Sequence, residues 1–209
     1  MAASSAASNN KSRKVKALLA GGLVLGVGAA VTLAAWTDQE WVKGEFTAGS
    51  FNIQGSTNGT DFSDHASADG AAQLGFDLPA NLSANLAPGD TVAAPFSLRL
   101  AAGTTYDAAV KLKSAAGTGD NAGNLTYKLV QVADAASCTP EAAGTETLVA
   151  AETSLNTAPD TAEFALEQGT SNTAGTAVNL CFQVTAGDDL QQGKMATATW
   201  QFEGTSPEN

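Results

Sequence analysis

The sequence has few basic residues, a single histidine and two cysteines. Ten Lys and Arg stand against 21 Asp and Glu in 209 residues, for a net charge of −11. His65 is the only histidine, so no pair of histidines can bind a metal ion, and neither HExxH nor Gly-x-Ser-x-Gly occurs. Zinc peptidases and serine hydrolases are built around such motifs, so this chain lacks their catalytic constellations. We predict that it is not an enzyme and has no catalytic residue and no metal centre.

Long hydrophobic runs are absent except for one near the N-terminus. Nineteen uncharged and mostly small or apolar residues extend from Ala17 to Ala35. Four positive charges precede this run, at Lys11, Arg13, Lys14 and Lys16. A basic region followed by an apolar segment that ends in small residues is typical of a secretory signal peptide. We therefore expect a signal peptide over residues 1–35, with an n-region at 1–16 and a hydrophobic helix at 17–35.

The bond that a signal peptidase would cut lies at the end of this run. A cut after Ala34 places Thr32 and Ala34 at the −3 and −1 positions, where small side chains are favoured. A cut after Ala35 would put the bulkier Leu33 at −3. We favour Ala34 and keep Ala35 as the alternative.

An uncleaved membrane anchor is the competing interpretation of the same run. Its length approaches the roughly 20 residues that span the hydrocarbon core of a bilayer. Four glycines, at positions 21, 22, 26 and 28, weaken a permanent helix by about 1 kcal/mol each relative to alanine. They favour a transient signal, and membrane contact is then expected only through the uncleaved segment.

The chain after the signal is strongly acidic. Because the signal removes four basic residues, six Lys and Arg remain against 21 Asp and Glu, a balance of −15. Such a surface repels nucleic acid and anionic lipid, so neither is expected as a partner. It attracts cations or a basic partner instead.

The residues after the hydrophobic run resemble a known family of exported proteins. Trp36 is followed by Thr37-Asp38, a charged spacer, and then Phe46-Thr47-Ala48-Gly49-Ser50-Phe51-Asn52-Ile53. This pattern is similar to the start of proteins with a SipW-type signal peptide, the TasA and camelysin family. A second similarity is the stretch from Asn81 to Leu98, with its Pro-Gly-Asp turn. The resemblance implies a dedicated signal peptidase, a secreted jelly-roll domain and a place in the cell surface or biofilm matrix.

The two cysteines, Cys138 and Cys181, both follow the signal. An even, small number of cysteines in an exported chain indicates a disulfide. Two separate buried thiols are the alternative. Cys181 has the opposite parity to its neighbours Leu180 and Phe182, so we expect it to leave the core face and reach Cys138 on the outer side of a sheet.

Alternating apolar residues and Gly, Asn and Asp turns predict short strands throughout residues 36–209. We expect them at residues 46–53, 73–78, 92–100, 106–113, 125–132, 145–155, 161–166, 177–185 and 196–202. The patterns at 145–155 and 161–166 are ambiguous: residues 146–152 fit a short helix as well as a strand, and we favour the strand. Residues 54–72 and 114–124 are predicted to be a loop and a turn region. Pro95 indicates an edge or a bulge, since proline cannot donate to a ladder. The fold class is therefore all-β, an antiparallel β-sandwich in a single secreted domain.

The segment freed by cleavage contains several large apolar side chains. Trp36, Trp41, Val42 and Phe46 precede the first core strand. Exposed apolar residues of this kind are a liability for a monomer. They either fold back on their own sandwich or pair with another copy, and both options stay open. The resemblance implies donation of this segment as a strand, which would propagate into fibres.

Two loops carry clustered carboxylates that could hold a Ca²⁺ ion weakly. They are Asp61, Asp64 and Asp69 in one loop and Asp188 and Asp189 in another. Neither set has the spacing of a dedicated calcium loop, so no cofactor is predicted beyond this weak option. Two function classes remain: a secreted structural protein that self-associates, and an exported binding module or camelysin-like peptidase.

Overall fold

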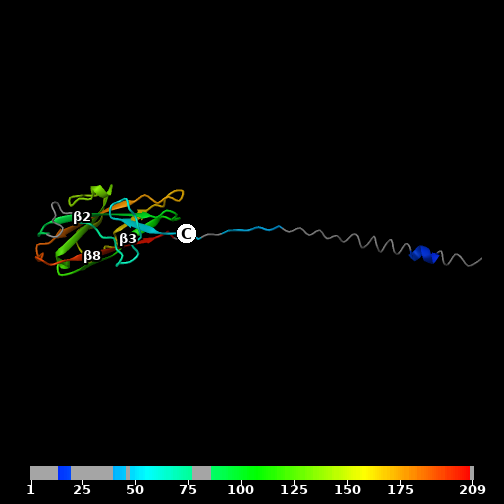
Figure 1. Cartoon of the computed structure of the whole chain (residues 1–209), viewed down its shortest axis with the longest axis horizontal. Coiled ribbons are helices and arrows are strands. Elements are labelled where there is room, and N and C mark those ends of the chain that lie inside the picture. The colour runs from blue at the N-terminus through cyan, green and yellow to red at the C-terminus, as the bar shows by residue number, and fades with distance from the viewer. Residues whose placement is uncertain (1–13, 20–39, 46–47, 77–85, 208–209) are drawn as a thin grey trace, which may run out of the picture. The chain divides into compact units, whose positions relative to one another are not determined.

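The computed structural model describes residues 14–19, 40–45, 48–76 and 86–207 (Figure 1). The chain divides into two compact units, Met1–Phe46 and Thr47–Asn209. In the first unit, residues 14–19 are helical and residues 40–45 have no regular structure. None of the helical stretches in these ranges is long and apolar enough to cross a membrane. The cleavage residues Ala34 and Ala35 lie outside the described residues.

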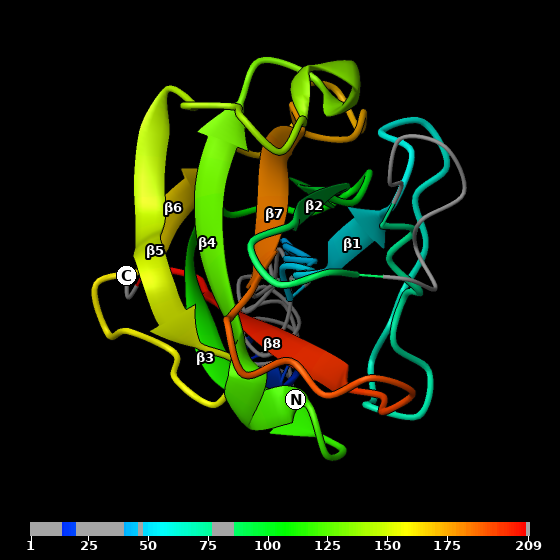
Figure 2. The same ribbon diagram turned by 90° about the vertical axis from the view of Figure 1, so that its left-hand side faces the viewer.

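The second unit is a sandwich of two antiparallel sheets, which confirms the predicted fold class. A five-stranded sheet has the order β1-β2-β7-β4-β5, and a three-stranded sheet has the order β6-β3-β8 (Figure 2). The strands are β1 (Ile53–Ser56), β2 (Thr91–Leu100), β3 (Ala108–Thr118), β4 (Leu125–Val132), β5 (Glu146–Ser154), β6 (Glu163–Leu166), β7 (Val178–Ala186) and β8 (Thr197–Thr205). Two short 3-10 turns, Ala122–Asn124 and Ala135–Ser137, flank β4.

This strand order is that of a jelly roll with one strand moved. Two Greek keys wound into an eight-stranded jelly roll give sheets of order 2-7-4-5 and 6-3-8-1. Here β2-β7-β4-β5 and β6-β3-β8 follow that order, but β1 pairs with β2. The place beside β8, where the first strand of a jelly roll lies, is therefore not taken by β1.

The core lies between the two sheets and is built by every second residue of the strands. Val110 and Leu112 of β3, for example, are buried while Lys111 and Lys113 point to solvent. Aromatic rings fill the centre: Phe182 lies 4.5 Å from Trp200 between ring centroids. Lys111 and Lys113 form ion pairs with acidic residues of β6 and β8 on the outer face. Packing of apolar side chains therefore holds the two sheets together.

Turn chemistry and strand pairing confirm two local predictions around β2. Gly89 has a φ of 87°, and the Asp90 amide donates to the Ala87 carbonyl at 3.0 Å, as the Pro-Gly turn requires. Pro95 lies in β2 between β1 and β7, but β1 pairs only with residues 97–100. The missing N–H of Pro95 thus falls where β2 has a single partner, which is locally an edge.

The prediction of a turn region at residues 114–124 was wrong in its first part. β3 continues to Thr118, with a register shift between Leu112 and Ser114 in its pairing with β8. The bulge interrupts the apolar alternation, and the small residues beyond it gave no strand signal. Pairing with β8 nevertheless extends as far as Thr118 with Thr197.

Two predicted strands near the start of the domain also need correction. Residues 73–76 form no strand, and residues 77–78 lie outside the described residues. The first strand in the described part of the chain is Ile53–Ser56: residues 48–52 are not a strand, since residues 50 and 52 pair only by isolated hydrogen bonds with the loop after β2. Residues 46–47 of the predicted strand lie outside the described residues. β5, β6, β7 and β8 all lie within two or three residues of their predicted bounds, and β4 coincides with its prediction.

Candidate functional site

The two sheets present four edges, and three of them are shielded. The edge at β1 is covered by Ser63, whose amide and carbonyl both bond to Gly55 at 3.0 Å. β5 is kinked at Glu152, which has a φ of 63° and lies at a register shift. β6 has only four residues. Covered, bulged and very short edges are the usual ways in which proteins prevent strands from pairing with other chains.

The fourth edge, β8, is long, and no residue that the structure describes shields it. It has nine residues and, within the described ranges, pairs with β3 alone. Its core-facing residues remain half-buried, unlike the fully buried Val110 and Leu112 of β3. These half-buried residues are Ala198, Trp200, Phe202 and Gly204. The flank of the sandwich beside β8 is therefore open, at the place of the displaced jelly-roll strand.

The opposite wall of this flank comes from β1 and β2. Phe96 of β2 is half-buried, and its ring centroid lies 6.1 Å from that of Phe202. Ile53 of β1 lies directly against Gly204, where an added Cβ would collide with it. Aromatic and aliphatic side chains thus line both walls. We call this surface, formed by β8 and the facing residues Ile53 and Phe96, the β8 flank.

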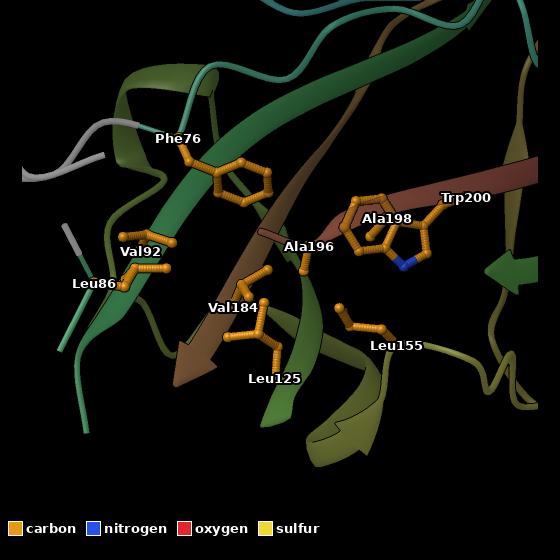
Figure 3. Close-up of a pocket in the computed structure, with 9 residues that line it drawn as sticks. All are labelled: Phe76, Leu86, Val92, Leu125, Leu155, Val184, Ala196, Ala198 and Trp200. Carbon is orange, nitrogen blue, oxygen red and sulfur yellow. The ribbon is translucent and has the colours of Figure 1, made fainter. Parts of the chain in front are cut away.

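One end of the β8 flank opens into an apolar cavity of about 190 Å³ between the sheets (Figure 3). Figure 3 shows Ala196 between the Phe76 ring and the Trp200 indole, which line the cavity from different segments of the chain. It is lined by Phe76, Leu86, Val92, Leu125, Leu155, Val184, Ala196, Ala198 and Trp200. We call this the cavity end of the sandwich; the other end, where residues 48–52 join β1, is the entry end.

Residues 72–76 lie against the core without joining a sheet. Ala72, Leu74 and Phe76 are half-buried, whereas the residues between them are exposed. Leu74 and Phe76 pack against the core cluster. Within the described part of the chain, no backbone hydrogen bond holds residues 72–76 to a strand. This stretch has the side-chain alternation of a strand but not its ladder, which explains why the sequence predicted one there.

The cysteines form the predicted disulfide on the outer face of the five-stranded sheet. The Cys138–Cys181 bond has a Cα–Cα distance of 5.1 Å. Cys181 packs with Val130 in a small cluster that is separate from the main core, as its parity predicts. The bond ties the loop between β4 and β5 to the centre of β7.

Gln183 is a buried polar residue that the sequence analysis did not single out. It lies two residues after Cys181 in β7, and its side-chain amide donates to the carbonyls of Thr139, Pro140 and Ala142 at 2.8–3.0 Å. A buried amide needs such partners because desolvation is costly. An isolated glutamine in an apolar strand is the only sequence signal for it. Together with the disulfide, Gln183 fixes the loop over the outer face.

Tyr127 is a further polar group deep in the sandwich. Burial raises its pKa to about 12, and the nearby Trp200 indole lowers it in part. The hydroxyl donates to the Thr157 carbonyl at 2.6 Å. Tyr127 is thus a neutral anchor at the base of the open flank.

The predicted assembly segment is described only in its middle. The side chains of Trp41 and Val42 are 89% and 100% exposed. Lys43 and Glu45 contact each other as an exposed ion pair. Trp36 and Phe46 lie outside the described residues. The described part therefore presents two large apolar side chains to solvent.

Two of the acidic residues considered for calcium accept hydrogen bonds from asparagine side chains. Asp61 accepts from the Asn58 amide at 2.7 Å and Asp64 from the Asn52 amide at 3.1 Å. Among the residues placed in the structure, no three His, Cys, Asp or Glu side chains lie close enough to hold a metal ion. Calcium binding at Asp69, Asp188 or Asp189 stays untested.

His65 is exposed on the loop that covers the β1 edge. Its Nε2 lies 3.3 Å from the Ser63 hydroxyl oxygen. Both residues belong to the stretch that bonds to Gly55. We therefore interpret His65 and Ser63 as part of the loop that shields the β1 edge.

Comparison with models of protein families and with curated proteins finds no match for this chain. The candidate site is accordingly the β8 flank, defined by its geometry.

Proposed function

We propose that the chain is an exported structural protein of the cell surface or biofilm matrix, which acts by self-association and not by catalysis. The observation that carries this proposal is the β8 flank, a nine-residue edge with half-buried aromatic residues that none of the placed residues shields. In the same chain, Trp41 and Val42 are exposed ahead of the domain. An open edge and an apolar extension are the two halves of a strand-addition contact.

Export is supported by two independent features. The basic and apolar order of residues 11–35 is that of a signal peptide. The Cys138–Cys181 disulfide is stable in oxidising compartments and rare in the cytosol. Cleavage after Ala34 by a dedicated signal peptidase then releases the segment that begins at Ala35, and the mature protein is secreted.

Self-association by this segment is a heterologous contact. The segment of one copy meets a different surface, the β8 flank, on the next copy. Such contacts generate open chains unless the rotation between copies closes a ring. Filaments of the acidic mature protein are therefore the expected product.

A truncation series tests the proposal. Protein beginning at Ala35 is compared with protein beginning at Phe46 by sedimentation velocity and negative-stain microscopy. We expect filaments from the first and monomers from the second. Equal behaviour of the two forms would refute assembly through the segment. A chelator-sensitive protease assay on the same material checks the other class, and activity there would favour an exported peptidase.

A further inference from the structure

We propose that the apolar cavity between the two sheets is a binding site for one small apolar molecule, a single ring with a short substituent that carries a hydrogen-bond acceptor such as a carbonyl oxygen. Two observations carry this inference: the size and lining of the cavity, and a buried indole N–H of Trp200 that has no partner among the described residues. The site is separate from the proposed self-association and does not depend on it.

The cavity arises where the core-facing positions along β8 change from large to small side chains. Ala196 and Ala198 have the same parity as Trp200 and Phe202 but fill much less of the space between the sheets. Val184 of β7 lines the cavity from the other sheet. Protein interiors contain few voids larger than a water molecule. A cavity of about 190 Å³ is therefore a distinct feature of this core.

The cavity has a closed floor and a partly exposed rim. The floor consists of the lining residues that are buried, Val92, Leu125, Leu155 and Val184. The rim consists of those that are half-buried, Phe76, Leu86, Ala196, Ala198 and Trp200. Because solvent reaches the rim residues, a small molecule can enter from their side without separating the two sheets.

The volume and the lining limit what the cavity can hold. A dry cavity of about 150 Å³ lined by Leu, Ile and Phe takes up benzene. At about 190 Å³, this cavity has room for one ring with a short substituent. Water is a poor occupant, because a buried water needs roughly two to four polar partners. Among the nine described side chains that line the cavity, the Trp200 indole nitrogen is the one polar atom.

The Trp200 indole determines the polarity of the ligand. Its Nε1 atom is buried, and no acceptor in the described part of the chain bonds to it. The indole lowers the pKa of the nearby Tyr127 in part, but the two groups do not reach hydrogen-bonding geometry, and the Tyr127 hydroxyl donates to the Thr157 carbonyl instead. Figure 3 shows the indole nitrogen on the edge of the ring turned toward Leu155. A buried donor without a partner is costly, so an acceptor on the ligand is favoured there.

A titration with two probes of the same shape tests the site. Acetophenone has a ring and a carbonyl oxygen, and α-methylstyrene has a methylene group in place of that oxygen. Protein beginning at Phe46 is suitable, because residues 47–209 form a compact unit with their own core and disulfide, and Trp200 is then the single tryptophan. We expect both probes to bind saturably, acetophenone about tenfold tighter, with a downfield shift of the indole proton in ¹H–¹⁵N NMR spectra for acetophenone alone. Absence of saturable binding, or equal affinity of the two probes, would overturn the inference whether or not the protein assembles.

Filling the cavity locates the bound probes. Ala198→Leu places a larger side chain in the cavity and should weaken binding of both probes by about tenfold or more. Ala116→Leu, the same substitution at an exposed position of β3, is the matched control and should leave binding unchanged. Ala196→Leu is a second filling variant, and thermal unfolding shows which variants remain folded. Undiminished binding by a folded filling variant would place the probes elsewhere and refute the site.

Removing the indole N–H tests the acceptor. Trp200→Phe keeps an aromatic ring at this position but has no donor. Isothermal titration calorimetry should show that acetophenone loses its advantage of about tenfold over α-methylstyrene in this variant, because the hydrogen bond is absent. If the variant still preferred acetophenone to the same extent, the carbonyl oxygen would not be bound by the Trp200 indole, and the proposed ligand chemistry would be wrong.

Discussion

At the scale of single residues, buried polar groups fix the loop that carries Cys138. Gln183 reaches three carbonyl oxygens of that loop through one side-chain amide. The sequence indicated strand β7 from its alternation of Leu180, Phe182 and Val184. It did not indicate the role of Gln183. The carbonyls that accept hydrogen bonds from Gln183 lie 41–44 residues earlier in the chain, so only the folded structure brings them together.

We predict that Gln183→Leu lowers the free energy of unfolding by about 1–3 kcal/mol, because the three loop carbonyls lose the amide that donates to them. Urea denaturation followed by tryptophan fluorescence measures it. Gln201→Leu is the control: Gln201 is exposed on β8, and its change should stay within about 0.5 kcal/mol. Equal stability of the Gln183 variant and the native protein would show that these bonds contribute nothing net.

Glu152 holds the kink of β5 at a backbone cost. Its φ of 63° lies in the left-handed region, which costs an L-residue roughly 1–2 kcal/mol. Glu152→Gly removes this strain but adds conformational entropy to the unfolded chain, which favours unfolding. The net result should be a rise of about 0.5–1 kcal/mol in the unfolding free energy. Glu163→Gly, in the regular strand β6, should lower it. Thermal unfolding compares them, and destabilisation by both would contradict the strain.

The pKa of Tyr127 gives the fold an alkaline limit. Because burial raises that pKa from 10.0 to about 12, the unfolded state loses the phenolic proton first as the pH rises. The stability contributed by neutral Tyr127 is thus fully present below pH 10 and is lost between pH 10 and about 12. Tyr127→Phe should be less stable at neutral pH and lose less stability over that window. Urea denaturation at several pH values measures the unfolding free energy of both proteins. The same dependence of that free energy on pH in the native protein and the variant would contradict the prediction.

At the scale of elements, the disulfide joins the loop after β4 to the centre of the larger sheet. The bond closes a 43-residue separation. In the chain-entropy treatment a loop of this size stabilises the fold by about 4 kcal/mol. The double variant Cys138→Ala, Cys181→Ala should lose about that amount in urea denaturation. Reductant should destabilise only the native protein, and equal sensitivity of both forms would contradict the prediction.

The sequence predicted strands well where alternation was regular and poorly where packing replaced pairing. β4 was predicted to the residue because Leu125, Tyr127 and Leu129 alternate without interruption. The end of β3 was missed because a bulge after Leu112 shifts the pattern, and only pairing with β8 reveals the strand. Residues 73–76 alternate like a strand but lack a partner.

At the scale of the whole molecule, the candidate site could be predicted only in part. The apolar load around Trp41 and Val42 was visible in the sequence. The acceptor that we propose for it, the β8 edge, was not, since an open edge is a property of strand order, and strand order depends on contacts between distant segments. β1 pairs with β2 and therefore does not occupy the position beside β8. As a result, the described part of the sandwich has one long edge that is not shielded.

The central claim is that a peptidase releases an oxidised β-sandwich whose new N-terminus begins at Ala35 and carries the assembly segment. Intact mass spectrometry of the native protein, recovered from the medium and the cell surface, tests cleavage and oxidation together. The predicted result is a chain of residues 35–209, lighter by two hydrogens than its reduced form. A chain recovered only from the cell interior, with Met1 to Ala34 still attached and both thiols free, would contradict the account.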